Sequence, residues 1–321
     1  MRAIVYGASI VTAALVAVAI ALVATSALTP PHAEPISYSV SSRAAATRPG
    51  GPAYLSLGDS LAAGVQPNAE GASLPTSHGY ADQLYTSLRT FQRGLRLVKL
   101  GCPGETTGTM VTGGLCGYRD GAESSYASPA GSQLAAATSY LATHRGQVSL
   151  ITIDIGANDL NPCLVLAGSR AVRACVARAI PVAQQNLTSV LAGLRFADYR
   201  STIIGMTYYD PALADWLTGP SGQQFAQLSA PLLATYNRAL TSVYHRFGVR
   251  VADVFTAFAS TDFRGQVTLP GAGPVPANVA RICAWTWACA APPAGPNEHA
   301  NQAGYAVIAR TFRAAYLPRP R

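Results

Sequence analysis

Five short apolar stretches recur along the chain, separated from one another by longer segments of mixed polarity. They are rich in Val, Ile and Leu, which is typical of strands that are covered on both faces of a parallel sheet. The pattern therefore predicts five buried strands, at Ala53–Leu57, Leu95–Leu100, Val148–Ile155, Ser201–Met206 and Val249–Val254.

Several of the segments between these stretches follow a helical period. The clearest is Phe225–Phe247, where apolar side chains recur on one face and Gly248 stands at the position where a helix commonly ends. Strands that alternate with helices predict βαβ units around one parallel sheet, which is an α/β fold. The other predicted helices are Gly79–Arg93, Ser132–His144, Arg170–Leu194 and Asn301 to Tyr316.

Two long segments, 104–130 and 256–298, are rich in Gly and Pro and are predicted to be loops. Both contain cysteines. Disulfide bonds are therefore expected to take the place of regular secondary structure there.

The first 33 residues look like an export signal. Arg2 precedes an uncharged stretch that is apolar through Leu28, and a cleavage site is expected at residues 25–27 or near Ala33. The stretch is also long enough to span a bilayer, so an uncleaved anchor is the alternative. Residues 34–50 are predicted to be a flexible tether. Residues 51–321 are then expected to form one domain outside the cytoplasm, secreted or attached to the membrane or cell wall.

Six cysteines fit an oxidising compartment, where an even number indicates disulfide bonds. Six cysteines allow fifteen pairings, and the sequence alone does not choose among them. Because the cysteines fall into three close pairs, sequential local bridges are favoured. These bridges are Cys102–Cys116, Cys163–Cys175 and Cys283–Cys289.

Charge and composition exclude several classes of function. Charged residues make up 12% of the chain, which argues against a disordered polyelectrolyte, and the basic residues behind the net charge of +8 are scattered. We find no nucleic-acid-binding motif, no zinc-type spacing of ligands, and no glycine pattern of a P-loop or dinucleotide site. We therefore expect no nucleic acid partner, no metal and no cofactor.

Small polar motifs follow three of the predicted strands at their carboxyl ends, where function collects in open parallel sheets. In Gly58-Asp59-Ser60-Leu61, Ser60 would begin a helix and expose its hydroxyl beside free backbone N–H groups. Gly101 follows the second strand and would let a backbone N–H approach a ligand. Asn158, in Gly156-Ala157-Asn158-Asp159, offers an uncharged amide suited to a transient oxyanion. Taken singly, a helix cap or a plain turn explains each motif.

His299 is the best candidate for a general base, because it follows the fifth strand and directly precedes an apolar helix. His245 lies within a predicted helix and His144 lies near the end of another, so both are interpreted as structural. His78, in a polar loop, is the remaining rival.

The order Ser, Gly, Asn, His at successive strand ends resembles the SGNH (GDSL-type) hydrolases, whose blocks are GDS(L), a Gly, GxND and DxxH. The likeness spans residues 53–316, and the first and third blocks match fully. It implies a three-layer α/β/α, flavodoxin-like fold with about five parallel strands, and ester hydrolysis without a cofactor. The cysteines and long loops look most like the secreted actinobacterial lipases and esterases of this family.

The resemblance and the chemistry of the residues agree on the roles. Ser60 would attack an ester carbonyl, and His299 would take its proton and return it to the leaving alcohol. The oxyanion would be held by the N–H groups of Ser60 and Gly101 and by the amide of Asn158. Asp59 and Asp159 are interpreted as residues that hold loops.

The fourth block departs from the family pattern, because Pro296 stands where DxxH has its Asp. Proline keeps its carbonyl, and a carbonyl can accept from Nδ1 and fix the tautomer of a histidine. We therefore predict that the carbonyl of Pro296, or of an immediate neighbour, orients His299. The rivals are Glu298 and an acid distant in sequence, such as Asp154.

The substrate is the least determined feature. Trp285 and Trp287 would either wall an acyl pocket or pack their loop onto the body of the protein. A small-molecule or lipid ester is expected, hydrolysed by a monomer. Carbohydrate O-deacetylation, lysophospholipid hydrolysis and a catalytically silent cell-surface binding protein remain the alternatives.

Overall fold

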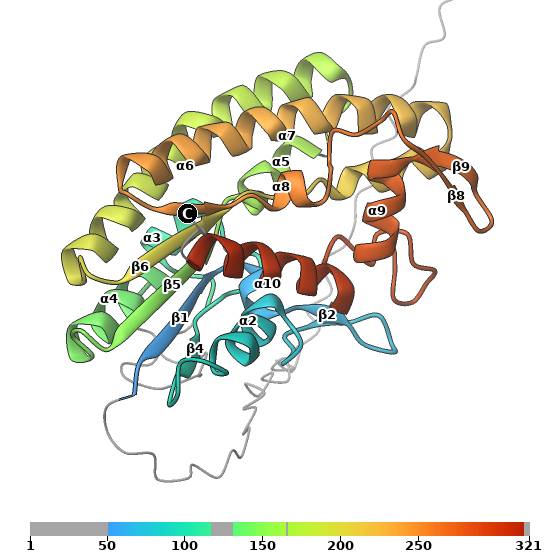
Figure 1. The fold of residues 1–321 in the computed structure, drawn as a ribbon. Coiled ribbons are helices and arrows are strands. Elements are labelled where there is room, and N and C mark those ends of the chain that lie inside the picture. Colours follow the sequence, from blue (N-terminus) through green and yellow to red (C-terminus); the bar gives the residue numbers. More distant parts are fainter. Residues whose placement is uncertain (1–50, 117–130, 165, 318–321) are drawn as a thin grey trace, which may run out of the picture. The chain divides into compact units, whose positions relative to one another are not determined.

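The computed structural model describes residues 51–116, 131–164 and 166–317, all within one compact unit, Arg48–Arg321. Its centre is a five-stranded sheet in the order β4-β1-β5-β6-β7, in which every neighbouring pair is parallel (Figure 1). The five predicted strands are confirmed to within a few residues at each end. They are β1 (Ala53–Gly58), β4 (Arg96–Lys99), β5 (Val148–Asp154), β6 (Thr202–Met206) and β7 (Arg250–Ala252).

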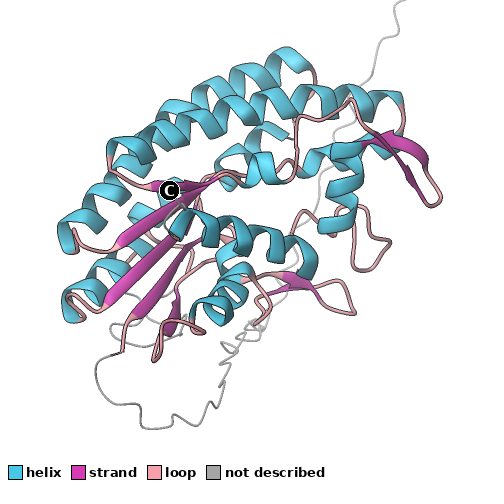
Figure 2. Cartoon of the chain, in the orientation of Figure 1, coloured by secondary structure: helices cyan, strands magenta, loops and turns pink. Residues whose placement is uncertain are grey.

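Helices cover both faces of the sheet, which makes the three-layer α/β/α arrangement (Figure 2). On one face α2 (Tyr80–Leu88) packs against α10 (Gln302–Tyr316), and the Tyr80 ring stacks on Phe312 at 4.8 Å. On the other face α6 (Ser169–Ala197) packs against both α4 (Gln133–Thr143) and α7 (Pro220–Arg246). Each of these helices buries one apolar stripe, as helices on a sheet must.

The helices begin and end close to the predicted residues, with two larger differences. α2 ends at Leu88, five residues before the expected Arg93. α7 starts at Pro220, five residues before the expected Phe225, because Pro220 occupies the first helical turn, where its missing N–H costs nothing. Gly248 adopts the expected left-handed conformation, with φ 63°, directly after the C-cap.

The prediction that 104–130 and 256–298 are loops is wrong in part. Residues Thr107–Thr112 form helix α3, which Thr106 caps through its side chain. Residues Val254–Ala257 form α8, Ala277–Trp285 form α9, and a hairpin joins β8 (Gln266–Leu269) to β9 (Gly273–Pro276). These elements are too short for a hydrophobic period to reveal them, and caps and disulfides hold them instead. Residues 117–130 lie outside the described part of the chain.

Shorter elements complete the fold around the central sheet, whose strands all run in the same direction (Figure 1). None of the helices in the described segments is long and apolar enough to cross a membrane. The remaining elements are α1 (Ser60–Ala63), β2 (Gln66–Pro67), β3 (Ser73–Leu74), η1 (Ala157–Leu160), α5 (Asn161–Leu164) and η2 (Pro211–Thr218).

Three disulfide bonds are present, and their pairings are those favoured from the sequence: Cys102–Cys116, Cys163–Cys175 and Cys283–Cys289. In this order, the bonds close loops of 14, 12 and 6 residues. Three such bonds fit a protein that works outside the cytoplasm. The predicted signal or anchor, 1–33, and the tether, 34–50, lie outside the described residues.

Candidate active site

A tight turn off the first strand positions Ser60. Gly58 ends β1 with φ 137°, a left-handed value that favours glycine, and an added Cβ there would collide with the carbonyl of Asp154. Asp59 then caps helix α1 by accepting from the N–H of Leu61 at 2.9 Å, so that Ser60 becomes the first helical residue. The Ser60 N–H donates to no group in the described part of the chain and remains available to a ligand.

Two buried carboxyl groups, of Asp59 and Asp154, hold helix α1 through hydrogen bonds to its backbone. Asp59 also accepts from the Tyr208 hydroxyl at 2.8 Å, while Asp154, at the end of β5, accepts from the N–H of Ala62 at 3.1 Å and from the Tyr80 hydroxyl. Carboxyl oxygens thus accept from the N–H groups of Leu61 and Ala62, the second and third residues of α1, which suits the positive end of a helix.

Burial changes the protonation of both acids. Desolvation raises the pKa of Asp59 to about 6, and desolvation together with the nearby Asp59 carboxylate raises the pKa of Asp154 well above its ordinary value. Both groups therefore hold structure rather than offer a ready base. Asp154 contacts α1 and not His299, so it is not the acid that orients the histidine.

Gly101 and Asn158 each have an N–H hydrogen for which the described residues provide no acceptor. Gly101 packs so closely against α1 that an added Cβ would stand 2.6 Å from the Ala63 nitrogen, and its own N–H has no acceptor among the described residues. Asn158 donates one amide hydrogen to the Glu105 carbonyl at 2.9 Å and accepts from Asn161 at 3.0 Å, which leaves its second amide hydrogen unused. Asp159 holds α3 by accepting from Thr107, as expected of a loop-holding residue.

The segment around His299 is tied to the loop closed by Cys283–Cys289. Trp287 donates its backbone N–H to the His299 carbonyl at 3.0 Å and accepts from Asn297 at 3.1 Å, and Thr286 forms a bridge with Ala300. These backbone hydrogen bonds fix the chain on both sides of the histidine.

The acceptor for His299 is Asn297, not the Pro296 carbonyl, so that prediction is wrong. His299 Nδ1 lies 2.7 Å from Asn297 Oδ1, and the same oxygen accepts the backbone N–H of His299 at 3.0 Å. A backbone N–H can only donate, so the facing atom must be the amide oxygen, and Nδ1 must carry the hydrogen. Asn297 Nδ2 donates to Ser73 at 2.8 Å, which agrees with this orientation.

The reason is a local turn that the sequence analysis missed. An Asn side chain readily accepts from the N–H two residues later, and this turn brings Oδ1 against the ring of His299 as well. An Asn two positions before a candidate base was the available signal. With Nδ1 protonated, Nε2 is left free to act as a base.

The protonation of His299 is set mainly by burial. Its side chain is 9% exposed, and desolvation lowers its pKa, while the carboxylate of Glu298 acts in the opposite direction. Glu298 Oε1 lies 4.0 Å from Nδ1 and its side chain is 69% exposed, so Glu298 makes no hydrogen bond to the ring. The imidazole is therefore neutral down to a lower pH than a free histidine.

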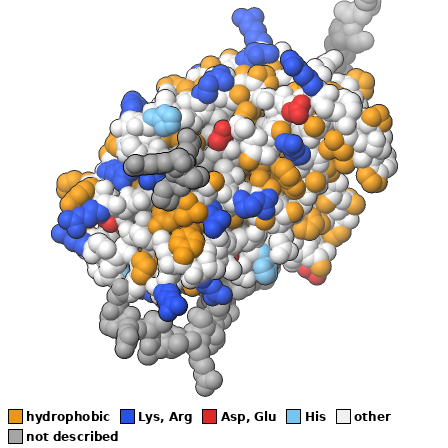
Figure 3. All heavy atoms as spheres, viewed as in Figure 1, with side chains coloured by type: hydrophobic (Ala, Val, Ile, Leu, Met, Phe, Trp, Pro, Cys, Tyr) orange, Lys and Arg blue, Asp and Glu red, His pale blue; other side chains and the backbone are white. Residues whose placement is uncertain are grey.

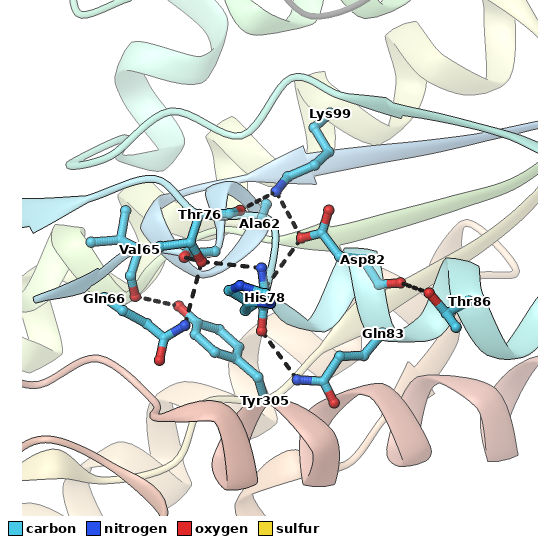
Figure 4. A network of polar contacts seen from close by, with 12 residues as sticks. Ala62, Val65, Gln66, Thr76, His78, Asp82, Gln83, Thr86, Lys99 and Tyr305 are labelled. Atoms are coloured by element: carbon cyan, nitrogen blue, oxygen red, sulfur yellow. Dashed lines mark hydrogen bonds and ion pairs between the residues drawn. The ribbon is translucent and has the colours of Figure 1, made fainter. Parts of the chain in front are cut away.

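The rival histidines lie elsewhere. His78 belongs to a polar network between the loop after α1 and helix α2, in which Gln83 donates to the His78 carbonyl and Lys99 joins Thr76 to Asp82 (Figure 4). His144 stacks on Tyr140 at 4.0 Å at the end of α4, and His245 lies in α7. None of the three lines the cavity described next.

Four of the five predicted site residues, Ser60, Asn158, Pro296 and His299, line one cavity of about 600 Å³. Gly101 packs against α1 and is not part of the lining. Trp285 and Trp287 are not part of it either, since Trp285 packs edge-on against Phe258 at 5.1 Å. Of the two interpretations of the tryptophans, loop packing is the one the structure supports.

The rest of the lining is mainly apolar and comes from η1, α5, α6, η2 and α7. Among the described residues that line the cavity, none is Lys or Arg. Within the described segments, no three His, Cys, Asp or Glu side chains gather as metal ligands would. On the face shown in Figure 3, Lys and Arg side chains lie in several separate places, in keeping with a generally basic surface.

Comparison with known proteins gives one match to a family and several to solved structures. The sequence model of the GDSL-like Lipase/Acylhydrolase family matches residues 56–307. An extracellular lipase from Streptomyces rimosus is 17% identical, with a TM-score of 0.52 over 82% of this chain and 99% of the lipase. A lipase from a goat rumen metagenome is also 17% identical, with a TM-score of 0.50 over 82% of this chain and 97% of its own.

An acetylxylan esterase from Geobacillus stearothermophilus is 17% identical as well, with a TM-score of 0.48 over 83% of this chain and 94% of the esterase. No curated protein matches the sequence. At 17% identity, the two lipases, with TM-scores of 0.50 and 0.52, show a shared fold.

Proposed function

Because the chain belongs to the GDSL-like Lipase/Acylhydrolase family and is a carboxylic ester hydrolase, we propose that it is an exported serine esterase with Ser60 as nucleophile and His299 as general base. One observation carries the proposal. Ser60, Asn158 and His299 line a single cavity, and His299 is held with Nδ1 protonated and Nε2 free.

The proposed reaction follows from these positions. Ser60 Oγ attacks the ester carbonyl while His299 Nε2 takes its proton, and the proton then passes to the leaving alcohol. Water releases the acyl group from Ser60 in a second step, again with His299 as base. The N–H groups of Ser60 and Gly101 and the free amide hydrogen of Asn158 stabilise the oxyanion. Losing one such donor typically costs roughly 100- to 1,000-fold in rate.

Export is part of the proposal. The apolar stretch within 1–33 and the three disulfide bonds support a secreted or surface-anchored protein.

A fluorophosphonate probe and a p-nitrophenyl ester test the chemistry together. The probe is expected to label one serine, mapped to Ser60, and Ser60→Ala is expected to lose both labelling and the burst of p-nitrophenol. Ser189→Ala, an exposed serine on α6, and His78→Ala, the rival base, are the matched controls and should keep both. Labelling of another serine, or none in a protein that hydrolyses esters, would overturn the assignment.

A further inference from the structure

The cavity has two sides of different chemistry, and the reaction assigns one to each half of the ester. His299 gives its proton to the leaving alcohol, so the alcohol lies on the side of His299, Asn297 and Glu298. The carbonyl oxygen points to the oxyanion donors, and the acyl chain leaves the carbonyl carbon in a third direction, away from that oxygen and from the leaving alcohol. Apart from the segment 296–299, much of the cavity is lined by η1, α5, α6, η2 and α7, and these elements offer a surface to the acyl chain.

The wall formed by η1, α5, α6 and α7 is mainly apolar. Leu160 and Leu164 project from η1 and α5, and Val172 and Val176, one helical turn apart on α6, also line the cavity. Leu160, Val172 and Val176 are each at most 8% exposed. Leu233 of α7 adds to the same lining.

The disulfide Cys163–Cys175 holds this wall together. Cys163 lines the cavity beside Leu164, and Cys175 lies between the two valines of α6, so the bond joins α5 to α6 where both face the cavity. A wall fixed in this way keeps the cavity open when no ligand fills it.

The electrostatics exclude an anionic acyl group. The lining contains Asp210, Asp215 and Glu298 and, among the described residues, no basic side chain. Asp210 is buried and already has a pKa raised to about 6 by desolvation, so a further negative charge beside it is strongly disfavoured. The whole cavity, with a volume of about 600 Å³, is sized for a drug-like ligand, so it has room for an acyl chain as well as for the alcohol part of an ester.

We propose that the space walled by η1, α5, α6 and α7 is an acyl-chain pocket, and that the enzyme acts on esters of uncharged fatty acids of medium length rather than on acetyl esters. This inference rests on the proposed function, since it places the acyl carbonyl at Ser60 and Asn158. Each methylene that enters the pocket should raise kcat/KM by up to roughly fourfold, the transfer free energy of a buried CH₂.

A chain-length series of p-nitrophenyl esters is the test, with acetate, butyrate and octanoate as substrates. The wild type is expected to prefer octanoate to acetate by at least tenfold in kcat/KM. Val176→Phe and Leu233→Trp fill the pocket from two different helices and should lower the ratio of the octanoate rate to the acetate rate at least tenfold. Labelling of Ser60 by the fluorophosphonate probe shows that each variant is folded.

Val182→Phe is the matched control, because Val182 lies on the same helix but is 56% exposed and outside the cavity. It should leave the preference unchanged. Release of acetate from an acetylated xylooligosaccharide, measured beside the series, covers the deacetylase alternative.

The outcomes separate the two claims. If Ser60 hydrolyses acetate as well as or better than octanoate, or if the filled variants keep the octanoate preference, the acyl-pocket inference fails while the esterase stands. If no ester is hydrolysed and Ser60 takes no probe, the proposed function fails and the inference fails with it.

Discussion

The pH response of the reaction depends on the environment of one histidine. Burial lowers the pKa of His299, so its neutral, basic form is present at a lower pH than that of a free histidine. We expect kcat/KM on p-nitrophenyl butyrate to rise with pH to a plateau, with a midpoint below ~6.5, the ordinary value for histidine.

Glu298→Gln refines this prediction. Removing the exposed carboxylate takes away an influence that raises the pKa of His299, so the midpoint should move slightly further down while the plateau rate stays within a few-fold. A loss on the order of 10⁴, as when the acid of a catalytic triad is neutralised, would instead make Glu298 the group that orients His299.

Asn297 provides the test of how His299 is oriented. Asn297→Ala removes the acceptor 2.7 Å from Nδ1 and is expected to lower the plateau rate by about 10- to 100-fold, the usual effect of one unsatisfied buried hydrogen-bonding group. Asn297→Asp would place a carboxylate at the same point, stabilise the imidazolium and move the midpoint of the pH profile upward.

The measurement is the pH profile of kcat/KM for both variants beside the wild type. A fall in rate alone would also follow from a disturbed loop, whereas an upward shift in Asn297→Asp that is larger than the shift produced by Glu298 places the new carboxylate beside the imidazole. If neither variant changes the profile, Asn297 does not orient His299.

At the scale of elements, disulfide bonds hold short segments around the active site that have little packing surface of their own. Cys163–Cys175 joins the short helix α5 to the long helix α6. Cys283–Cys289 closes the loop whose backbone is hydrogen-bonded to the segment of His299. Short helices such as α5 are only marginally stable by themselves, because few residues offset the free-energy cost of starting a helix.

Replacing Cys163 and Cys175 together by Ala is expected to lower the free energy of unfolding by about 2–4 kcal/mol, because the 12-residue loop is no longer closed in the unfolded chain. Urea unfolding measures this. The same variant should also lose part of its preference for octanoate, as the pocket wall loosens.

Cys102→Ala with Cys116→Ala is the control, since that bond closes a loop of similar length, 14 residues, away from the acyl wall. It should lose comparable stability and keep the ratio of octanoate to acetate rates. A changed ratio in both variants would show that the effect is general loosening.

At the scale of the whole molecule, buried acids make stability depend on pH. Desolvation raises the pKa of Asp210 to about 6, above the value of about 3.9 expected in the unfolded chain. A raised folded pKa means that the folded state holds the proton more tightly. Its contribution to stability is therefore complete below about pH 4 and is lost as the pH rises through about 6.

Asp210→Asn should remove this dependence. The amide keeps an acceptor for Ser229 or the Ala212 N–H but does not titrate. We expect the free energy of unfolding of the wild type, compared with the variant, to fall by on the order of 3 kcal/mol between pH 4 and pH 7. Equal pH dependence of the two proteins, measured by urea unfolding, would show that Asp210 is ionised without penalty.

Much of the fold and the core of the site can be read from local sequence patterns. The five strands and the main helices follow from hydrophobic periods that are complete within each segment. Parallel strands bring their carboxyl ends to one edge of the sheet, so Ser60 and Asn158 could be placed together. His299 follows the end of β7 only after α8, β8, β9 and α9, and its place beside Ser60 was implied by the family resemblance.

Other features of the site could not be predicted from the sequence, because they arise from contacts between distant segments or from a turn that packing selects. Asn297 takes the place of the expected Pro296 carbonyl because its side chain folds back on His299, and Ser73, far away in sequence, holds the other end of the amide. Asp154 supports α1 because β5 lies beside β1. Val172 and Val176 line the same cavity as Ser60 only because α6 packs against η1 and α5. No pattern along the chain carries this information, since a hydrophobic period says which face of a helix is buried but not which side chains it is buried against.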